Sequence, residues 1–426
     1  MLNRILAIAS GMLLGSVLAI GTAQFAVRLG WWPARELDRS TAYVRDVLKL
    51  VNDQYVEPGK VDYKELTKSA LQGIVGSLDP HSQFMDARDY AELREEMHNE
   101  FGGIGVQVEM QDGRVVVIAP IAGTPGEAAG ILRGDRIISV DGEPLNDATM
   151  DKVVTLLRGK PGTPVEVGFH RPSTERDFTL RIVRELIRVE SVREARLLSD
   201  GTGYINITQF SERTGQEVRD ALEHLRQQNM SALILDLRNN PGGLLSAAVA
   251  VSEPFFPEGE LIVYTQGRQP GDREEFRSGW RGRSVDVPIA VLINGGSASA
   301  AEIVAGALKD TRRAVIVGER SFGKGSVQSI FRLNDGEALR LTTARYFTPS
   351  GKTIHERGIE PDVEVVMSPQ EDRNLARQRA RPDLTDPREF EARFGEAPIR
   401  DRQMQLALEV LKAARLVDQR QAAVAR

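Results

Sequence analysis

The chain has 426 residues, carries a formal net charge of −5 at pH 7 and contains no cysteine. Its length allows two or three domains with a substantial core. The acidic charge, and the absence of a basic stripe with interleaved aromatic residues, exclude a general attraction to nucleic acid. Without cysteine there is no thiolate zinc site, no disulfide and no cysteine nucleophile, although this says nothing about the compartment.

The first residues have the layout of an export signal. Arg4 is followed by an apolar run from Ile5 to Ile20 and by small residues at 21–23. This order predicts a signal peptide within residues 1–26. Apolar residues resume at 25–29, so an uncleaved membrane anchor is the second interpretation. Both interpretations predict export to the periplasm, either free or anchored to the inner membrane.

Two segments of different periodicity come next. Residues 35–100 carry apolar residues at spacings of three and four, as in "YVRDVLKLVNDQYV", and this predicts an N-terminal helical region. From Phe101 the pattern changes to alternating apolar residues and glycine turns, as in "GIGVQVEMQDGRVVVIAPI". The change predicts a small β-rich module over residues 101–185.

Strands and helices alternate over residues 186–368, through "GYINITQF", "ALILDLRNN", "PIAVLINGG" and "AVIVGER". This rhythm predicts an α/β domain. Residues 369–400 are rich in Arg, Asp, Glu and Pro and are predicted to be a linker or loose arm. The stretch "DRQMQLALEVLKAARLV" predicts a closing amphipathic helix for packing or oligomerisation, so residues 369–426 form a charged linker and C-terminal helix.

Two serines stand at a turn from strand to helix in "NGGSASAAEIVAG", residues 294–306. One interpretation is an ordinary helix start, because Ser299 and Glu302 fit the S-x-x-E capping box. The other is a nucleophile, because the small residues allow close approach and a helix N-terminus offers N–H groups to a developing oxyanion. The residues alone do not separate Ser297 from Ser299.

A serine nucleophile needs a base, and the usual partner is histidine. None of the five histidines lies in a comparable glycine-framed turn: His81, His98, His170, His224 and His355. The stretch "VGERSFGKGSVQ" instead places Lys324 between two glycines after a strand. A lysine can act as a base if desolvation or positive surroundings lower its pKa. The alternative is a solvated loop lysine.

The stretch "GERSFGK" also matches the phosphate-loop pattern G-x-x-x-x-G-K. Two features argue against nucleotide binding. Gly325 follows the lysine where a Ser or Thr would bind magnesium, and the β-branched run "SVQSIFRL" follows where a helix should start.

A third glycine-rich turn is "LDLRNNPGG", residues 235–243. It is either an ordinary turn between strand and helix or a part of the same site. In the second case, Gly242 and Gly243 approach a substrate without side-chain hindrance and donate backbone N–H groups to an oxyanion.

These three motifs strongly resemble those of the C-terminal processing peptidases, also called tail-specific proteases, and "LDPHSQF" and "TPSGKTIHERGIEPD" look like further landmarks of that family. The resemblance covers about residues 40–368. It implies an α/β, crotonase-like protease core, with an inserted PDZ domain and helical N- and C-terminal segments. It further implies that Ser299, rather than Ser297, is the nucleophile and that Lys324 is the base. Gln328 would orient or assist the lysine. The oxyanion donors would be the backbone N–H groups of Ala300 and of Gly242 or Gly243. No metal or cofactor is required.

The β-rich module resembles a PDZ domain in two places. "FGGIGVQVEM" is similar to the carboxylate-binding loop and its following strand, and "GTPGEAAGILRGDRIISVDG" to the central helix-turn-strand stretch. The resemblance implies that N–H groups of Gly103, Ile104 and Gly105 hold a terminal carboxylate. The strand from Val106 would then pair with the peptide, and apolar pocket residues would favour apolar C-terminal side chains.

The sequence thus predicts a serine endopeptidase that recognises apolar C-termini of exported proteins through its PDZ domain and cleaves them by a Ser–Lys dyad, for processing or degradation. One alternative is a catalytically silent PDZ scaffold, which the complete set of Ser299, Lys324 and Gln328 disfavours. Another is an acyl-transfer or lyase enzyme, for which no coenzyme motif is present. Expected partners are protein or peptide substrates, an adaptor or activator protein, further copies of the chain and, through the N-terminus, a membrane.

Overall fold

The computed structural model describes residue 22 and residues 35–111, 113–146, 148–381 and 384–424. The chain forms two compact units, Met1–Phe84 and Met85–Arg426. The predicted signal peptide or anchor lies outside the described residues apart from Thr22. Among the helices that are described, none has the length and apolar character needed to cross a membrane.

The first unit consists of helices with little buried surface. It contains α2 (Arg35–Gln54), the short 3-10 helix η1 (Pro58–Lys60) and α3 (Tyr63–Gly76), and β1 (Gln83–Met85) stands at its boundary. The Asp62 carboxylate caps α3 by accepting from the N–H groups of Lys64 and Glu65. Together with α4 (Ala87–His98) of the second unit, these helices account for the predicted helical region of residues 35–100.

The β-rich module is a small antiparallel sheet with its own core. Its strands are β3 (Val106–Gln111), β4 (Arg114–Pro120), β5 (Arg136–Val140), β6 (Glu143–Pro144), β7 (Pro164–Arg171) and β8 (Arg176–Val183), and its helices are α5 (Pro125–Ala128) and α6 (Met150–Leu157). The sheet order is β3-β4-β5-β7-β8, with β6 on β5, so β3 is an edge strand. Ile104, Val117, Val153 and Phe169 are buried in its core.

Within the second unit, the chain enters and leaves the module at one place. Strand β2 (Glu100–Gly103) precedes the module and pairs antiparallel with β9 (Glu185–Arg188), which follows it. Because the two ends of the module are hydrogen-bonded to each other, it is arranged as an insertion, which agrees with the expected inserted PDZ domain.

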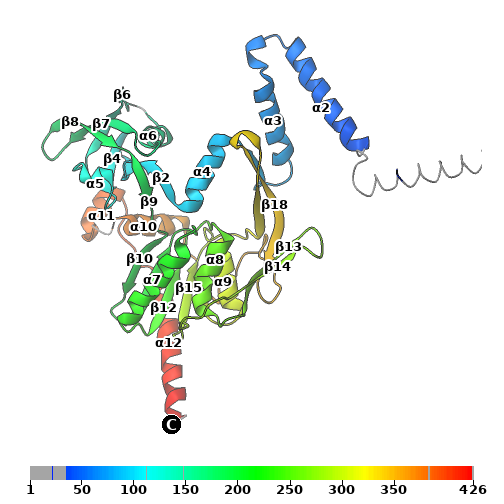
Figure 1. The fold of residues 1–426 in the computed structure, drawn as a ribbon. Coiled ribbons are helices and arrows are strands. Elements are labelled where there is room, and N and C mark those ends of the chain that lie inside the picture. Colours follow the sequence, from blue (N-terminus) through cyan, green and yellow to red (C-terminus); the bar gives the residue numbers. More distant parts are fainter. Residues whose placement is uncertain (1–21, 23–34, 112, 147, 382–383, 425–426) are drawn as a thin grey trace, which may run out of the picture. The chain divides into compact units, whose positions relative to one another are not determined.

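The α/β core is a six-stranded sheet covered on both faces. Its order is β10 (Val192–Leu197), β11 (Thr202–Ile207), β12 (Ala232–Asp236), β15 (Ile289–Ile293), β16 (Val315–Gly318) and β19 (Val363–Glu364), all parallel except β10. Helices α7 (Thr214–Gln227), α8 (Leu245–Ser252) and α9 (Ala300–Asp310) cover one face (Figure 1). Helix α12 (Arg402–Val424) covers the other through Ala407 and Leu411.

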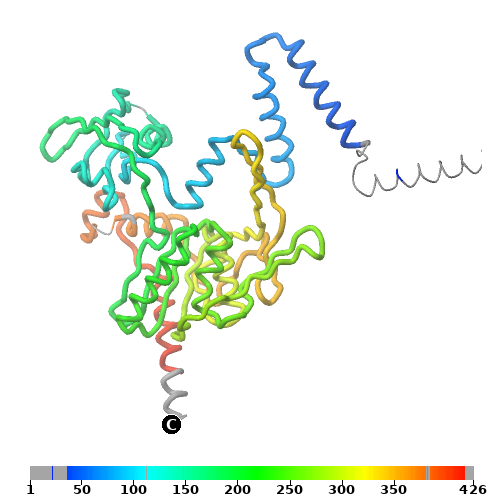
Figure 2. Tube along the Cα trace, viewed as in Figure 1, coloured from blue at the N-terminus to red at the C-terminus, as the bar shows by residue number. Residues whose placement is uncertain are grey.

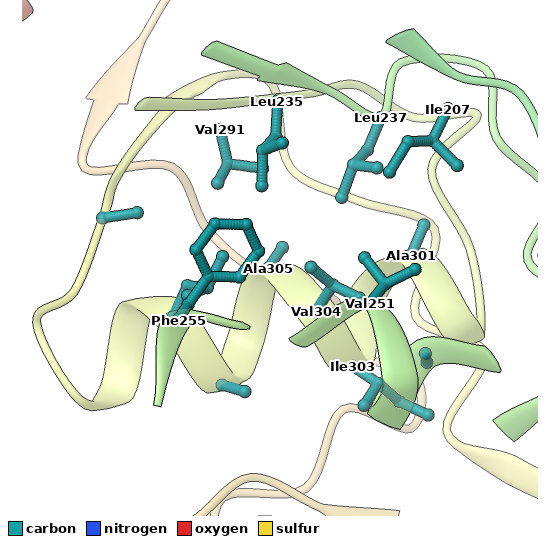
Figure 3. Close-up of a cluster of buried hydrophobic side chains, with 14 of the residues drawn as sticks. Ile207, Leu235, Leu237, Val251, Phe255, Val291, Ala301, Ile303, Val304 and Ala305 are labelled. Atoms are coloured by element: carbon teal, nitrogen blue, oxygen red, sulfur yellow. The ribbon is translucent and has the colours of Figure 1, made fainter. Parts of the chain in front are cut away.

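Burial on both faces explains the continuous apolar strands of the core. Along β12, Leu235 packs toward Val251 of α8, Val304 of α9 and Phe255, which lies just after α8, as Figure 3 shows. The neighbouring Ile234 belongs to the cluster with Ala407 and Leu411 on the opposite face. The sequence pattern therefore predicted these strands correctly.

A further sheet of this unit is antiparallel. It contains β13 (Leu261–Gly267) and β14 (Arg273–Arg277), which follow the short helix η2 (Glu253–Phe255), and also β17 (Ser326–Arg332) and β18 (Ala338–Phe347). Strands β17 and β18 are joined through η3 (Asn334–Gly336) and form a long hairpin, yellow in Figure 2.

The C-terminal segment is more regular than its composition predicted. Residues 369–400, expected to be a linker or loose arm, include α10 (Pro369–Ala380) and α11 (Pro387–Phe394). The buried guanidinium of Arg238, at the end of β12, donates to both oxygens of Asp401 over 2.8 and 2.9 Å and pairs with Asp236. Arg379 of α10 also pairs with Asp236 at 3.2 Å and with Asp401 at 2.8 Å. A buried charge needs such partners, so these contacts fix α10 and the residue after the arm to the core. The partners are far apart in sequence, and composition alone could not indicate them.

Candidate active site

Three predicted motifs meet at one edge of the core sheet. "LDLRNNPGG" follows β12, "NGGSASAAEIVAG" follows β15 and "SFGKG" follows β16. The three strands are parallel neighbours, so their carboxyl ends lie together. A cavity of about 490 Å³ opens there. Its lining includes five predicted site residues: Ser299, Lys324, Gln328, Gly242 and Gly243.

The two serines of the turn have different surroundings. Ser297 is fully buried, and its Oγ donates to the Leu237 carbonyl at 2.8 Å and accepts from the Asn294 N–H at 3.0 Å. Ser299 lines the cavity and has φ 56° and ψ −115°. A non-glycine residue in such a sparsely populated conformation costs about 1–3 kcal/mol and is typical of functional sites. Only Ser299 presents its side chain to the cavity.

The glycine turn after β12 lies directly against the serine turn. A Cβ atom at Gly242 would lie 2.6 Å from the Ser299 Cβ and 2.9 Å from the Ala300 backbone N. Any side chain there would collide with the serine turn. The Gly242 N–H donates to Asn240 Oδ1 at 2.9 Å. In the described part of the chain, the N–H groups of Gly243 and Ala300 have no acceptor.

A buried carboxylate joins the serine turn to the lysine turn. Glu302 Oε2 accepts from the backbone N–H groups of Ser299 and Lys324, both at 2.8 Å. Its Oε1 accepts from the Gly323 N–H at 2.7 Å and from the Ser321 hydroxyl at 2.6 Å. Burial raises the pKa of Glu302, and the four hydrogen bonds act in the opposite direction. The sequence indicated Glu302 only as a helix cap, and nothing in it indicated the link to Lys324.

Lys324 is half-buried at the cavity rather than solvated. Burial lowers its pKa, the positive charge of Arg340 lowers it further, and the Glu302 carboxylate acts in the opposite direction. Gln328 lines the same cavity, but its side-chain amide donates to the carbonyl and the hydroxyl of Ser326, at 3.2 and 2.8 Å. In this geometry Gln328 is beside the lysine loop without donating to Lys324.

Tyr346 is a further site residue that the sequence did not single out. Its ring is almost fully buried, and its hydroxyl donates to the Lys324 carbonyl. Burial raises the pKa of Tyr346, whereas a hydrogen bond with the Ser299 side chain lowers it. The phenol therefore stays neutral and contacts both turns. Tyr346 is on β18, and no local motif marks it.

The predicted carboxylate-binding loop lies beside the edge strand of the β-rich module. Gly103 ends β2, Val106 begins β3, and Ile104 between them is buried. Gly105 has φ +75°, and a Cβ there would lie 2.3 Å from Thr124. The N–H groups of Ile104 and Gly105 have no acceptor among the residues that the structure describes. The loop thus presents unpaired donors next to an open strand edge.

The described residues contain no group of three or more His, Asp or Glu side chains that could hold a metal ion.

Comparison with known proteins agrees with this architecture. Residues 201–365 match peptidase family S41, and residues 102–182 match the PDZ domain. The chain is 42% identical over 324 residues to a carboxy-terminal-processing protease of Bartonella bacilliformis, covering 75% of this chain and 74% of that protein. It is 38% identical over 328 residues to a carboxyl-terminal-processing protease of Synechocystis, covering 75% of each.

Among solved structures, the photosystem II D1 C-terminal processing protease is similar, with 29% sequence identity and a TM-score of 0.44 over 76% of this chain and 92% of that one. The predicted family, the α/β class, the PDZ domain and the hydrolytic activity are confirmed. The chain therefore belongs to peptidase family S41 and is a carboxy-terminal processing protease with a PDZ domain.

Proposed function

We propose that this protease cleaves peptide bonds with Ser299 as nucleophile and Lys324 as base. The observation that carries the proposal is that Ser299 and Lys324 line one cavity, while the buried Glu302 carboxylate accepts from the backbone N–H groups of both residues at 2.8 Å. The lowered pKa of Lys324 supports its role, because only an uncharged amine can accept a proton. The direct test is cleavage of a peptide with a free apolar C-terminus by the full chain, and its loss in Ser299→Ala.

The reaction then proceeds in two halves. Lys324 Nζ takes the hydroxyl proton while Ser299 Oγ bonds to the peptide carbonyl carbon. The lysine returns the proton to the leaving amine as the C–N bond breaks, which leaves an acyl-enzyme. Lys324 next takes a proton from water, the hydroxide attacks the ester, and the serine regains its proton.

Two backbone donors are suited to the oxyanion. The N–H groups of Gly243 and Ala300 have no acceptor among the described residues, whereas the Gly242 N–H already donates to Asn240. This favours Gly243 of the two alternatives, with Gly242 supplying the close approach to Ser299. Each such donor typically contributes 10²–10³-fold to kcat.

The silent-scaffold alternative is less well supported. A scaffold has no need of a serine in a strained conformation or of a lysine kept in a half-buried position. Both features cost stability, and both are explained by proteolysis.

The PDZ domain is proposed to bind the free apolar C-termini of protein substrates. In the loop between β2 and β3, the N–H groups of Ile104 and Gly105 have no acceptor among the described residues and would hold the terminal carboxylate. Strand β3 is at the sheet edge, so the strand from Val106 can pair with an extended peptide. Gly103, at the end of β2, completes the predicted loop.

Amidation of a peptide's C-terminus should weaken its binding about tenfold or more. The change removes one charge, and charge-assisted hydrogen bonds contribute roughly 1.5–3 kcal/mol each, while about 1.4 kcal/mol corresponds to a factor of ten. The measurement is the affinity of the Ser299→Ala chain for matched free-acid and amidated peptides. Equal affinities would remove C-terminus recognition from the proposal even if the Ser–Lys pair is correct.

A pair of glycine variants supplies the control. Gly105→Asn should weaken binding of the free-acid peptide, because its Cβ would collide with Thr124. Gly130 has a similar φ of +76° with open space around the position, so Gly130→Asn should bind normally. The comparison separates damage to the loop from the general cost of a positive φ.

Export, membrane association and self-association complete the proposal. The signal layout before Arg35 supports a periplasmic location, free or anchored. Large apolar side chains exposed on α2, such as Leu37 and Leu50, support association with further copies of the chain or with an adaptor.

A reporter enzyme that works only outside the cytoplasm should be active when fused after Arg35. The fusion keeps the whole predicted signal and excludes the protease. Release of the full chain by washing rather than by detergent would then identify cleavage rather than anchoring. A fusion active only with a cytoplasmic reporter would contradict export.

A further inference from the structure

Arg340 is a charged residue of the cavity with no role in the reaction described so far. It is half-buried on β18, where it pairs with Ile330 of β17, and the next pair on the same side is Gln328 with Thr342. Residues two apart along a strand point to the same face. Arg340, Ile330 and Gln328 all line the cavity that holds Lys324. The β17–β18 hairpin (Figure 2) therefore presents a guanidinium to the site of the lysine.

Charged side chains from three different elements lie around Lys324. Arg340 comes from β18, Glu96 of α4 lines the cavity, and Glu302 of α9 accepts from the Lys324 backbone N–H. Tyr346 of β18 contacts the Lys324 carbonyl and stays neutral. Among the described residues that line the cavity, Arg340 is the cation besides Lys324.

Two cations that share a confined site disfavour each other. Arginine does not lose its proton in proteins, so the lysine is the group that becomes uncharged. Of the charged groups that act on Lys324, Arg340 lowers the lysine pKa and Glu302 raises it. Burial acts in the same direction as Arg340 and is the larger cause.

We propose that Arg340 is a positioning residue for proteolysis, whose fixed positive charge acts together with burial to favour the uncharged Lys324 amine that accepts the Ser299 proton. This inference rests on the proposed role of Lys324 as base. The β17–β18 hairpin would then contribute to the reaction through the charge of Arg340, as well as supporting the sheet.

The test is the pH dependence of kcat and KM for the full chain and for Arg340→Gln. Loss of the cation should move the acidic limb of the kcat profile to higher pH. Below that limb, each unit of displacement lowers kcat about tenfold, because the uncharged fraction of the lysine falls by that factor. At a pH above both limbs, Arg340→Gln should approach the rate of the parent enzyme. Arg340→Lys, which keeps a cation, should displace the limb less.

Arg345→Gln is the matched control. Arg345 is on the same strand at odd spacing from Arg340, is exposed, and pairs with Ser326 outside the cavity lining. Its removal changes the net charge equally and should leave the limb in place. Thermal unfolding of each variant shows whether it is folded. As a second measurement, raising the ionic strength should move the limb of the parent enzyme toward that of Arg340→Gln, because salt screens the charge.

Three results would overturn the inference. In the first, the acidic limb of the kcat profile stays in place in Arg340→Gln and on addition of salt. In the second, kcat of Arg340→Gln falls equally at every pH. In the third, only KM rises, which would indicate that Arg340 binds an acidic substrate side chain. Each of these is distinguishable from failure of the proposed base. If Lys324→Arg is active, the base assignment fails, whereas an unmoved limb with an inactive Lys324→Arg overturns only the role of Arg340.

Discussion

Replacement of Ser299 by alanine is expected to abolish peptide cleavage and to leave the chain folded. The substitution removes the Oγ atom that lines the cavity beside Lys324. Alanine is as small as the residues around it, and it occupies φ 56° at the same cost as serine. Loss of the nucleophile in a serine protease lowers kcat by roughly 10⁶-fold. The measurement is cleavage of a free-acid peptide, together with the midpoint of thermal unfolding.

The matched control is Ser297→Ala, two positions away in the same turn. Ser297 is buried and bonded to the Leu237 carbonyl and the Asn294 N–H. Its replacement leaves the Asn294 N–H without this acceptor, whereas the Leu237 carbonyl still accepts from the Asn240 N–H at 3.3 Å. The loss should cost about 1–3 kcal/mol of stability. The folded fraction should still cleave peptide at an appreciable rate. An inactive Ser297→Ala beside an active Ser299→Ala would reverse the assignment of the nucleophile.

Local sequence was sufficient to predict the elements that place the site. Strands β12, β15 and β16 are short apolar runs that end in glycine-rich turns, so periodicity and turn residues identify each of them. Because the strands are parallel in the structure, the three turns lie at one edge of the sheet, and the shared cavity lies there. The resemblance added the choice of Ser299 over Ser297, which the residues had left open.

The rest depends on contacts between distant parts of the chain. Glu302 was predicted as a cap for α9, and that bond to the Ser299 N–H is present, but its bonds to Gly323 and Lys324 cross to another loop. Tyr346 reaches the site from a strand with no catalytic motif. No single segment encodes such contacts, because they exist only once the sheets have assembled.

The same reason accounts for the C-terminal segment. Its high content of charged residues predicted a loose arm, since exposed charge usually remains solvated. Here Arg379 of that arm pairs with the buried Asp236 of β12 and with Asp401. Asp401 directly follows the arm and pairs with the buried Arg238. A charged residue that supplies the partner of a buried charge cannot be distinguished by composition from one that lies in solvent.

Lys324→Arg is expected to be as inactive as Lys324→Ala. Arginine keeps the positive charge and is slightly longer than lysine, yet it does not give up its proton in a protein. A charge-stabilising role would tolerate this change, and a role as base would not. General-base catalysis contributes about 10²–10⁴-fold, so the loss in kcat should be at least of this size.

Lys309→Arg on α9 is the control for this substitution. Lys309 forms an ion pair with Asp362 at 2.9 Å, away from the cavity lining, and arginine can keep that pair. This variant should cleave peptide at the parent rate. Substantial turnover by Lys324→Arg would remove Lys324 from the role of base.

The pH dependence of the parent enzyme also tests the assignment of Lys324 as base. The base form of Lys324 is the uncharged amine, so activity should rise with pH as the lysine loses its proton. An ordinary lysine does so near pH 10.4. Burial and the Arg340 charge lower the pKa of Lys324, so the rise should occur below that value. A profile that falls with increasing pH over this range would mean that the protonated lysine is the active form. Lys324 would then be a charge stabiliser and not the base.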